Sequence, residues 1–183
     1  MQRCEWAGTD TLMVDYHDKE WGVPVHNDQK LFEFLILEAF QAGLSWSTVL
    51  KKRENFRMAF DNFDANTIAK YNEKKVQKLI SNPGIIRNKL KIKAAITNAR
   101  AFLAVQKEFG SFDKYIWKFA NKKHRTPTSV SQIPATSDES DAISKELRKR
   151  GFRFVGSTIC YAFMQATGMT NDHLKTCFRN NSK

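Results

Sequence analysis

The segment Glu38–Trp46 combines residue types from which a ligand pocket could be built. Glu38 follows the mainly apolar run Leu31–Leu37, so its carboxylate is predicted to lie among buried side chains of one helix. Because a buried carboxylate without a partner is costly, a basic side chain or a ligand must pair with it. Trp46 adds a flat aromatic surface and Lys51–Arg53 adds positive charge, which suits a pocket beside a polyanion. A core helix with one structural glutamate is the alternative that this segment alone leaves open.

Aromatic residues with polar tips flank the same helix. Tyr16 and Trp21 precede it and Trp46 follows it, so the three rings could form a stacking pocket for a planar ligand. Trp6 is interpreted as a core residue, which is the ordinary place for an aromatic side chain.

Two pairs of cysteine and histidine lie at opposite ends of the chain. Cys4 and His17 are near the start, and His173 and Cys177 near the end are four residues apart, on one face if they are helical. Two sulfurs and two imidazoles match the ligand set of a closed tetrahedral zinc site. The spacing is unspecific, and on spacing alone unrelated buried cysteines and surface histidines are the favoured interpretation.

The segment 141–164 indicates a helix, a short turn containing glycine, and a second helix. Gly156 would let a phosphate approach the free amides of Ser157 and the next two residues, beside a cluster that includes Arg150 and Arg153. On these residues alone, a plain helical hairpin explains the pattern as well as a DNA-backbone clamp does.

Composition narrows the class of protein. The 183 residues carry a net charge of +11, but residues 1–40 hold three basic and eight acidic side chains, so the excess of positive charge lies in the rest of the chain. That asymmetry favours a nucleic-acid partner. No apolar run is long enough to span a bilayer, and the first residues do not resemble a signal peptide, so no membrane association and a cytoplasmic location are expected. Three scattered cysteines argue against a disulfide framework.

Helical periodicity runs along the whole chain, and no alternating strand pattern is evident, so the fold is predicted to be all-α. In the long helix expected at 86–106, Leu90 is assigned to the buried side, and Arg87, Lys89, Lys91 and Lys93 are expected to face outwards. Residues 121–137, with two prolines, are interpreted as a surface connection. The other helices are expected at 27–43, 47–60, 64–71, 73–81, 112–119 and 137–149.

Seven motifs together identify a family. The sequence closely resembles the type I 3-methyladenine-DNA glycosylases over nearly its whole length. The motifs that carry this resemblance are Arg3–Trp6, Tyr16–Pro24, Glu38–Trp46, Val49–Glu54, Gly84–Arg87, Gly151–Gly156 and Asn171–His173.

The resemblance implies a helix-hairpin-helix glycosylase fold, with one domain over 1–183, two interleaved helical lobes and the hairpin at about 141–166. It implies an enzyme that flips 3-methyladenine out of double-stranded DNA containing alkylated purines, hydrolyses the N-glycosidic bond, and leaves an abasic site and the free base. A monomer is expected, although the sequence does not determine the oligomeric state. In base-excision repair of this kind, a cationic base needs no protonation to leave, and strand cleavage is not expected.

The resemblance also assigns roles to residues. It implies that Glu38, Tyr16 and Trp46 line the base pocket with Trp21 close by, and that Cys4, His17, His173 and Cys177 hold one structural zinc ion that joins the termini. Glu38 is the catalytic candidate. Gly43 or Leu44 is the candidate for filling the gap left by the extruded base, and Arg150, Arg153, Gly156 and Ser157 are expected to contact DNA.

Three positions and two alternatives stay open. Met13 and Ala162 differ from residues common in the family, so their effect on the pocket is not determined, and Asp172 is given no catalytic role. A zinc-stabilised helix-hairpin-helix module that binds DNA without catalysis would explain the charge and the termini but not Glu38. An RNA-binding protein that uses aromatic stacking platforms lacks a recognisable RNA module.

Overall fold

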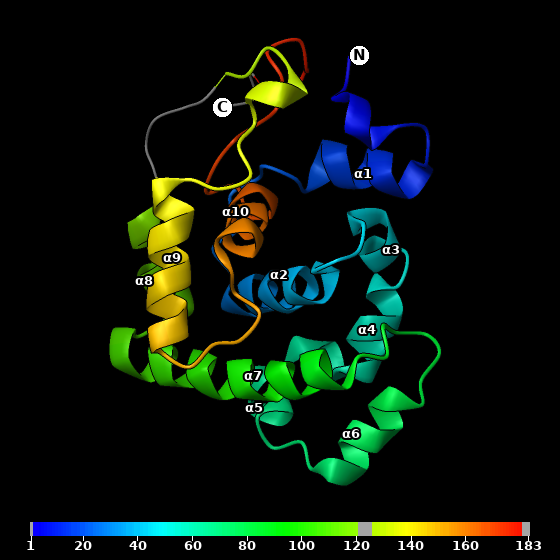
Figure 1. The fold of residues 1–183 in the computed structure, drawn as a ribbon, viewed down its shortest axis with the longest axis vertical. Helices are drawn as coiled ribbons and strands as arrows, with labels where there is room; N and C mark the ends of the chain where they lie inside the picture. Colours follow the sequence, from blue (N-terminus) through cyan, green and yellow to red (C-terminus); the bar gives the residue numbers. More distant parts are fainter. Residues whose placement is uncertain (1, 121–125, 181–183) are drawn as a thin grey trace.

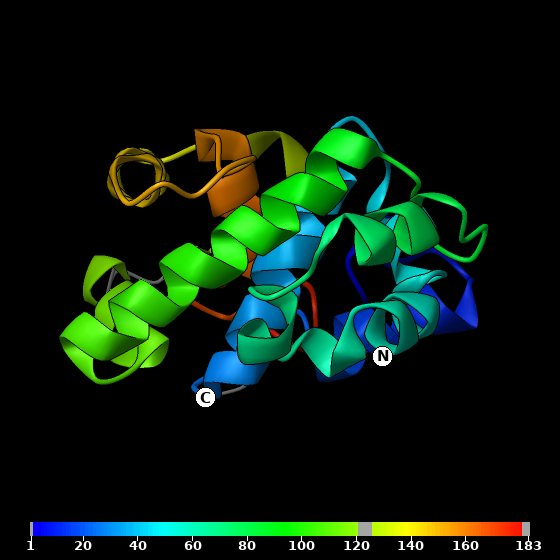
Figure 2. The same ribbon diagram turned by 90° about the horizontal axis from the view of Figure 1, so that it is seen from below.

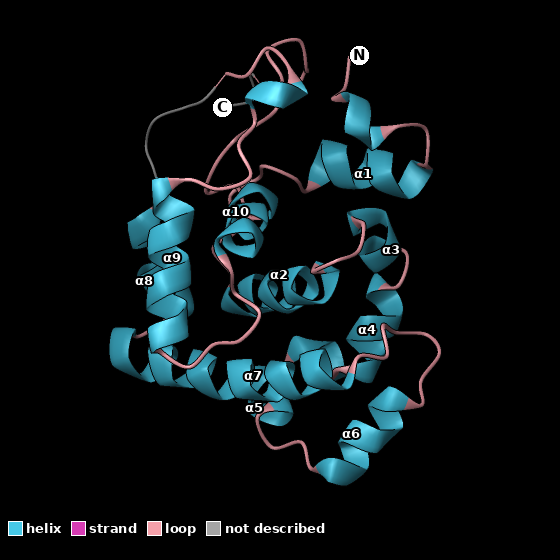
Figure 3. Ribbon diagram, viewed as in Figure 1, coloured by secondary structure: helices cyan, strands magenta, loops and turns pink. Residues whose placement is uncertain are grey.

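The computed structural model describes residues 2–120 and 126–180, and within these ranges every regular element is a helix (Figure 3). The predicted all-α fold is therefore confirmed. The helices are η1 (Glu5–Ala7), α1 (Thr11–Lys19), α2 (Asp28–Gln41), α3 (Trp46–Leu50), α4 (Arg53–Ala59), η2 (Asp61–Phe63), α5 (Ala65–Ile68), α6 (Glu73–Ile80), α7 (Lys89–Phe109), α8 (Phe112–Ile116), η3 (Trp117–Phe119), η4 (Val130–Gln132), α9 (Asp138–Lys149) and α10 (Ser157–Ala166).

Helix α2 is the centre of the molecule. It begins at the Asn27 cap, whose side chain accepts a hydrogen bond from the Lys30 amide, and all ten residues from 31 to 40 are buried. A helix that is apolar on every side can only be stable when other elements surround it. Here α3, α7, α8 and α10 pack against α2 (Figure 1), and α7 crosses it obliquely (Figure 2).

The long helix α7 begins at Lys89, three residues later than expected, because the side chain of Asn88 caps it by accepting from the Lys91 amide. Its assigned faces are wrong at two adjacent positions. Leu90 is 70% exposed, and Lys91 is only 7% exposed. The packing of α7 against α2 therefore places a lysine inside and a leucine outside.

The single helix expected at 47–60 is two helices, α3 and α4, separated at Lys51 and Lys52. Ser45 caps the first by accepting from the Thr48 amide, and Lys52 has a non-helical backbone that redirects the chain. The break allows buried residues of both short helices, Leu50 and Phe56 among them, to reach the core. The sequence interpretation also missed α1, a nine-residue helix capped by Asp10.

Helices α9 and α10 form the expected hairpin. Ser137 caps α9, and the connection 150–156 contains two residues with positive φ, Gly151 at +89° and Phe154 at +56°. Asn98, fully buried on α7, holds this connection by bonding both backbone groups of Arg153 at 2.7 and 3.0 Å. The hairpin is thus fixed to the longest helix of the fold.

The two ends of the chain meet. The Phe178 amide donates to the Gln2 carbonyl at 3.0 Å, and the Lys175 amide donates to the Pro127 carbonyl at 2.8 Å. Part of the surface connection expected at 121–137, residues 121–125, lies outside the described residues, and so does His124. No helix in the described part of the chain is long and apolar enough to cross a membrane.

Candidate active site

A cavity of about 300 Å³ lies where α1, α2, α3 and α10 meet, a size at the lower end of small-molecule sites. It is lined by Trp6, Met13, Tyr16, Trp21, Glu38, Gln41, Trp46, Val130, Ile133, Ala162 and Gln165. All four residues predicted to form the base pocket are in this set.

Glu38 is the chemical centre of the cavity. Its residue is 2% exposed, and its Oε2 atom has no hydrogen-bond partner among the described residues. Burial alone raises the pKa of this carboxyl group to about 8, with no basic side chain offsetting the shift. The sequence left two possible partners for this carboxylate, a basic side chain or a ligand. No described residue supplies a basic partner, so a ligand is the remaining candidate.

Aromatic rings form the walls around Glu38. The rings of Tyr16 and Trp46 lie 5.1 Å apart between centroids, and those of Trp6 and Trp21 lie 4.9 Å apart, nearly edge to face. The indole Nε1 of Trp46 is buried and has no hydrogen-bond partner among the described residues. The interpretation of Trp6 as an ordinary core residue is wrong, since it lines the cavity. The walls can stack on a flat ring, and the unpaired Glu38 Oε2 and Trp46 Nε1 can form hydrogen bonds with its edge.

The rest of the cavity wall comes from α2, α10 and the connection before α9. Gln41 lies one turn after Glu38 on α2, a spacing that could have revealed it. Gln165 lies on α10, where its Nε2 donates to the Asp172 carboxylate at 2.9 Å. Val130 and Ile133 belong to the connection before α9, and no local sequence signal places that connection at the pocket.

Asp172 lies behind the cavity wall. It is 1% exposed and accepts a hydrogen bond of 2.6 Å from the Tyr161 hydroxyl in addition to the one from Gln165. It is not among the residues that line the cavity. This position accords with giving Asp172 no catalytic role.

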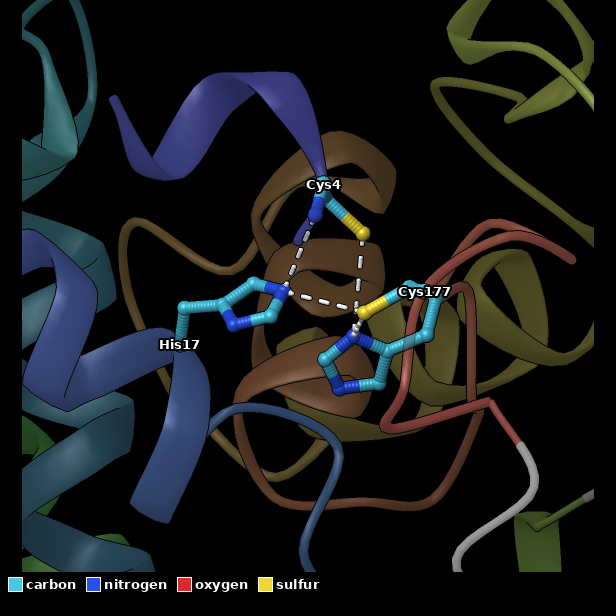
Figure 4. Close-up of side chains that lie close together, drawn as sticks. Cys4, His17 and Cys177 are labelled. Carbon is cyan, nitrogen blue, oxygen red and sulfur yellow. Dashed lines mark hydrogen bonds between the residues drawn. The ribbon is translucent and has the colours of Figure 1, made fainter. Parts of the chain in front are cut away.

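The four predicted metal ligands come together from both ends of the chain. Figure 4 shows Cys4, His17 and Cys177 pointing toward one another. Cys177 Sγ lies 3.4 Å from His17 Nε2 and 3.5 Å from His173 Nδ1, and Cys4 Sγ lies 3.7 Å from His173 Nδ1. All four ligand atoms are within 4.8 Å of one another, and all four residues are buried. We call these residues the Cys/His cluster.

The cluster fits a tetrahedral metal ion. Zinc–sulfur bonds of about 2.3 Å and zinc–nitrogen bonds of about 2.0–2.1 Å, at tetrahedral angles, separate sulfur from nitrogen by about 3.6 Å. The three measured separations, between 3.4 and 3.7 Å, agree with that value. Burial lowers the pKa of His173 to about 4 and so favours the neutral imidazole that a metal needs.

Each histidine of the cluster is oriented by a second hydrogen bond. The Nδ1 of His17 lies 2.7 Å from an Asp18 oxygen, and Asp18 is held in turn by Arg3 at 2.8 Å. The Nε2 of His173 lies 3.1 Å from the Trp21 carbonyl oxygen. Such partners, which fix the ring and its tautomer, are typical of metal-binding histidines.

Trp21 connects the cluster to the cavity. Its ring packs edge to face on His173 with centroids 4.5 Å apart, and the same residue lines the cavity beside Glu38. Tyr16 and His17 are consecutive on α1, and Tyr16 lines the cavity while His17 belongs to the cluster. The Cys/His cluster therefore sets the position of two pocket walls.

The residues expected at DNA lie in two exposed turns. In the turn after α2, Gly43 has φ +81° and Leu44 is 43% exposed. In the hairpin, Gly156 starts α10 with no side chain capping the first amides. Arg150 is engaged elsewhere, because its guanidinium group bonds Glu108 and Glu146 at 2.7 and 2.8 Å.

The comparisons with known proteins place the chain. The family model described as methyladenine glycosylase matches residues 6–180. The chain belongs to the methyladenine glycosylase family. It is 50% identical over 179 residues to DNA-3-methyladenine glycosylase 1 of Escherichia coli K12, covering 97% of this chain and 96% of that protein. It is 47% identical over 177 residues to DNA-3-methyladenine glycosylase of Haemophilus influenzae Rd, covering 96% of each.

Solved structures agree with the fold as well. The chain superimposes on a crystal structure of 3-methyladenine DNA glycosylase I with a TM-score of 0.94 and 51% identity, over 97% of this chain and 98% of the other. A Staphylococcus aureus 3-methyladenine DNA glycosylase I gives the same TM-score at 31% identity, over 100% of this chain and 98% of that one. The family and the fold predicted from the motifs are both confirmed.

Proposed function

We propose that this protein is a DNA-3-methyladenine glycosylase that removes the alkylated base from double-stranded DNA by hydrolysis. The observation that carries the proposal is the buried Glu38 carboxyl group, whose Oε2 has no partner inside a cavity walled by aromatic rings. The relatives support it, since both bacterial proteins bear this name and a solved relative at 31% identity is described in complex with 3-methyladenine.

The chemistry asks little of the protein beyond holding the flipped base. Methylation at N3 gives the base a positive charge within the nucleoside, so the glycosidic bond breaks without protonation of the leaving group. The aromatic walls supply stacking and cation–π attraction of about 0.5–2 kcal/mol. Water then adds to the oxocarbenium-like sugar. No lysine lines the cavity among the described residues, which favours hydrolysis without strand cleavage.

Glu38 is assigned the recognition of that charge. A cationic base beside the carboxyl group favours its ionised form, so binding of the base opposes the shift that raises the pKa of Glu38 to about 8. The ionised form can accept a charge-assisted hydrogen bond from the edge of the base, which is stronger than a neutral one. Neutral, unmodified bases lack the positive charge that would favour ionisation of Glu38 against its raised pKa.

The assignments of the metal and the DNA contacts rest on geometry. The donor set and separations of the Cys/His cluster favour one structural zinc ion, held by Cys4, His17, His173 and Cys177. The turn after α2 favours Gly43 or Leu44 as the group that fills the gap left in the duplex by the extruded base. The hairpin favours Arg153, Gly156 and Ser157 as contacts to the DNA phosphate backbone. Arg150 is less suited to contact DNA, because it already pairs with the carboxylates of Glu108 and Glu146. All these groups belong to one chain, so a monomer suffices.

Incubation of the purified protein with methylated duplex DNA, followed by identification of the released bases, tests the function. The proposal expects free 3-methyladenine and abasic sites, with normal bases left in place. Binding to DNA without any released base would instead identify the non-catalytic binding module, and preferential binding to RNA, again without released base, would identify the RNA-binding alternative.

A further inference from the structure

Lys91 is a buried cation that neither the base pocket nor the Cys/His cluster uses. It is 7% exposed, and its Nζ donates to the carbonyl oxygens of Phe40 at 2.9 Å and Ala42 at 2.6 Å. No ion pair joins it to an acidic side chain of a described residue, and burial lowers its pKa. Removing an ammonium group from water is costly, so an apolar side chain would be the simpler choice for filling this position.

The two acceptors lie where helix α2 ends. The last carbonyls of a helix lack partners within the helix and carry its partial negative charge, so an ammonium group is stabilised there. Lys91 reaches these carbonyls from the first turn of α7, across a separation of about fifty residues. Its bonds therefore join α7 to the end of α2.

The clamped end continues into the turn Ala42–Leu44. Ala42 leaves the helix with ψ 114°, Gly43 takes φ +81°, and the Leu44 amide donates back to the Gln41 carbonyl. Glu38 lies four residues before Ala42, and Trp46 lies four residues after it. The conformation of this turn therefore sets the position of Trp46 relative to the Glu38 carboxyl group. The turn also carries the exposed Leu44.

We propose that Lys91 is a positioning residue for base extrusion: its ammonium group fixes the turn Ala42–Leu44 in the shape that keeps the target base out of the duplex. This inference rests on the proposed function. It assigns Lys91 a role in the duplex-specific step rather than in phosphate binding, because its ammonium group is buried and bonded to two carbonyl oxygens.

The test compares Lys91→Met with Lys93→Met. Lys93 lies two residues further along α7, is half-exposed, and contacts Glu73 at 3.5 Å, so its variant removes the same charge without touching the turn. Single-turnover release of 3-methyladenine is measured from a duplex and from the same strand alone, with DNA affinity measured in parallel. Helical signal and metal content are checked for each protein.

Lys91→Met is expected to slow release from the duplex 10- to 100-fold and from the single strand less than threefold, with DNA affinity within threefold of the parent. Lys93→Met is expected to stay within threefold of the parent in all three measurements. If Lys91→Met does not fold, Lys91→Gln, which keeps a polar group at the site, decides by the same ratio of duplex to single-strand rates.

Equal slowing on both substrates, or parental release from the duplex, would overturn the role of Lys91. A parent protein that releases no 3-methyladenine from either substrate would instead overturn the proposed function. The two failures are therefore distinguishable in one experiment.

Discussion

The Cys/His cluster and the pocket around Glu38 are neighbours that both bury polar groups. They differ in how many of these groups have hydrogen-bond partners. In the cluster, each histidine has a second hydrogen-bond partner, Asp18 for His17 and the Trp21 carbonyl for His173. In the pocket, Glu38 Oε2 and Trp46 Nε1 are buried without any partner among the described residues. Leaving a buried polar atom unsatisfied costs stability, and two such atoms on residues that line one cavity suit a ligand that would satisfy both.

On the proposed function, the cluster stabilises the fold and the pocket holds the flipped base. The two regions are joined, since Tyr16 and His17 are adjacent on α1 and Trp21 contacts both. Loss of the cluster should therefore damage stability and pocket alike, whereas changes in the pocket should leave stability intact or improve it.

The largest effect is expected from Cys177→Ser. Removing one ligand should release the metal and lower the free energy of unfolding by more than about 4 kcal/mol, as losses of structural metals do. Cys160→Ser is the matched control, because Cys160 is equally buried but lies outside the cluster. Elemental analysis and denaturant unfolding measure both quantities. A fully metal-loaded, equally stable Cys177→Ser protein would contradict the role of the cluster.

The next effect is a pH dependence of stability that comes from Glu38. Burial raises its pKa from 4.5 to about 8 in the folded state, so the folded protein retains a proton that the unfolded chain has lost. Its contribution to stability is therefore fully present below about pH 4.5 and is lost as the pH rises through about 8, at about 1.4 kcal/mol per pH unit.

Glu38→Gln removes this titration, so the variant should become the more stable protein as the pH rises from 5 to 8. Urea unfolding of both proteins at several pH values gives the difference between their free energies of unfolding. The contributions of the other titrating groups cancel in this difference. A difference that does not change with pH would show that the carboxyl group is not desolvated as described.

A smaller effect is expected from Asp18→Asn. The carboxylate orients His17, and loss of such a partner lowers metal affinity about 10- to 100-fold. Asp15→Asn is the control on the same helix, since Asp15 is exposed and forms an ion pair with Lys19 at 2.9 Å. Competition with a chelator measures the affinities. Equal affinities in the two variants would mean that the Asp18–His17 contact does not tune the site.

The sequence predicted which residues form the cluster and the pocket better than it predicted how the fold positions them. The apolar run around Glu38 predicted its burial, and two thiols with two imidazoles matched a tetrahedral ion, but residue types alone left a structural glutamate and unrelated cysteines and histidines open. The family motifs then joined chain ends that no local pattern connects. Tertiary contacts decided the rest.

Particular errors show why. Helical periodicity assigned Leu90 to the core and Lys91 to solvent. The structure shows the opposite, because the Lys91 ammonium group bonds the carbonyl oxygens at the end of α2. The break between α3 and α4 follows from the need to bury side chains of both helices, which depends on the surrounding core rather than on local propensity. Val130 and Ile133 reach the cavity through a connection whose path is set by contacts far away in sequence.

The most direct test of the central claim is the release of 3-methyladenine by Glu38→Gln. A neutral amide cannot give the charge-assisted hydrogen bond, worth about 1.5–3 kcal/mol, so single-turnover release from methylated duplex should fall about 10- to 150-fold. DNA affinity, metal content and helical signal should stay at parental values, and Trp46→Ala should show a parallel loss through stacking. Release of 3-methyladenine by Glu38→Gln at the parental rate would show that the unsatisfied carboxyl group does not recognise the base.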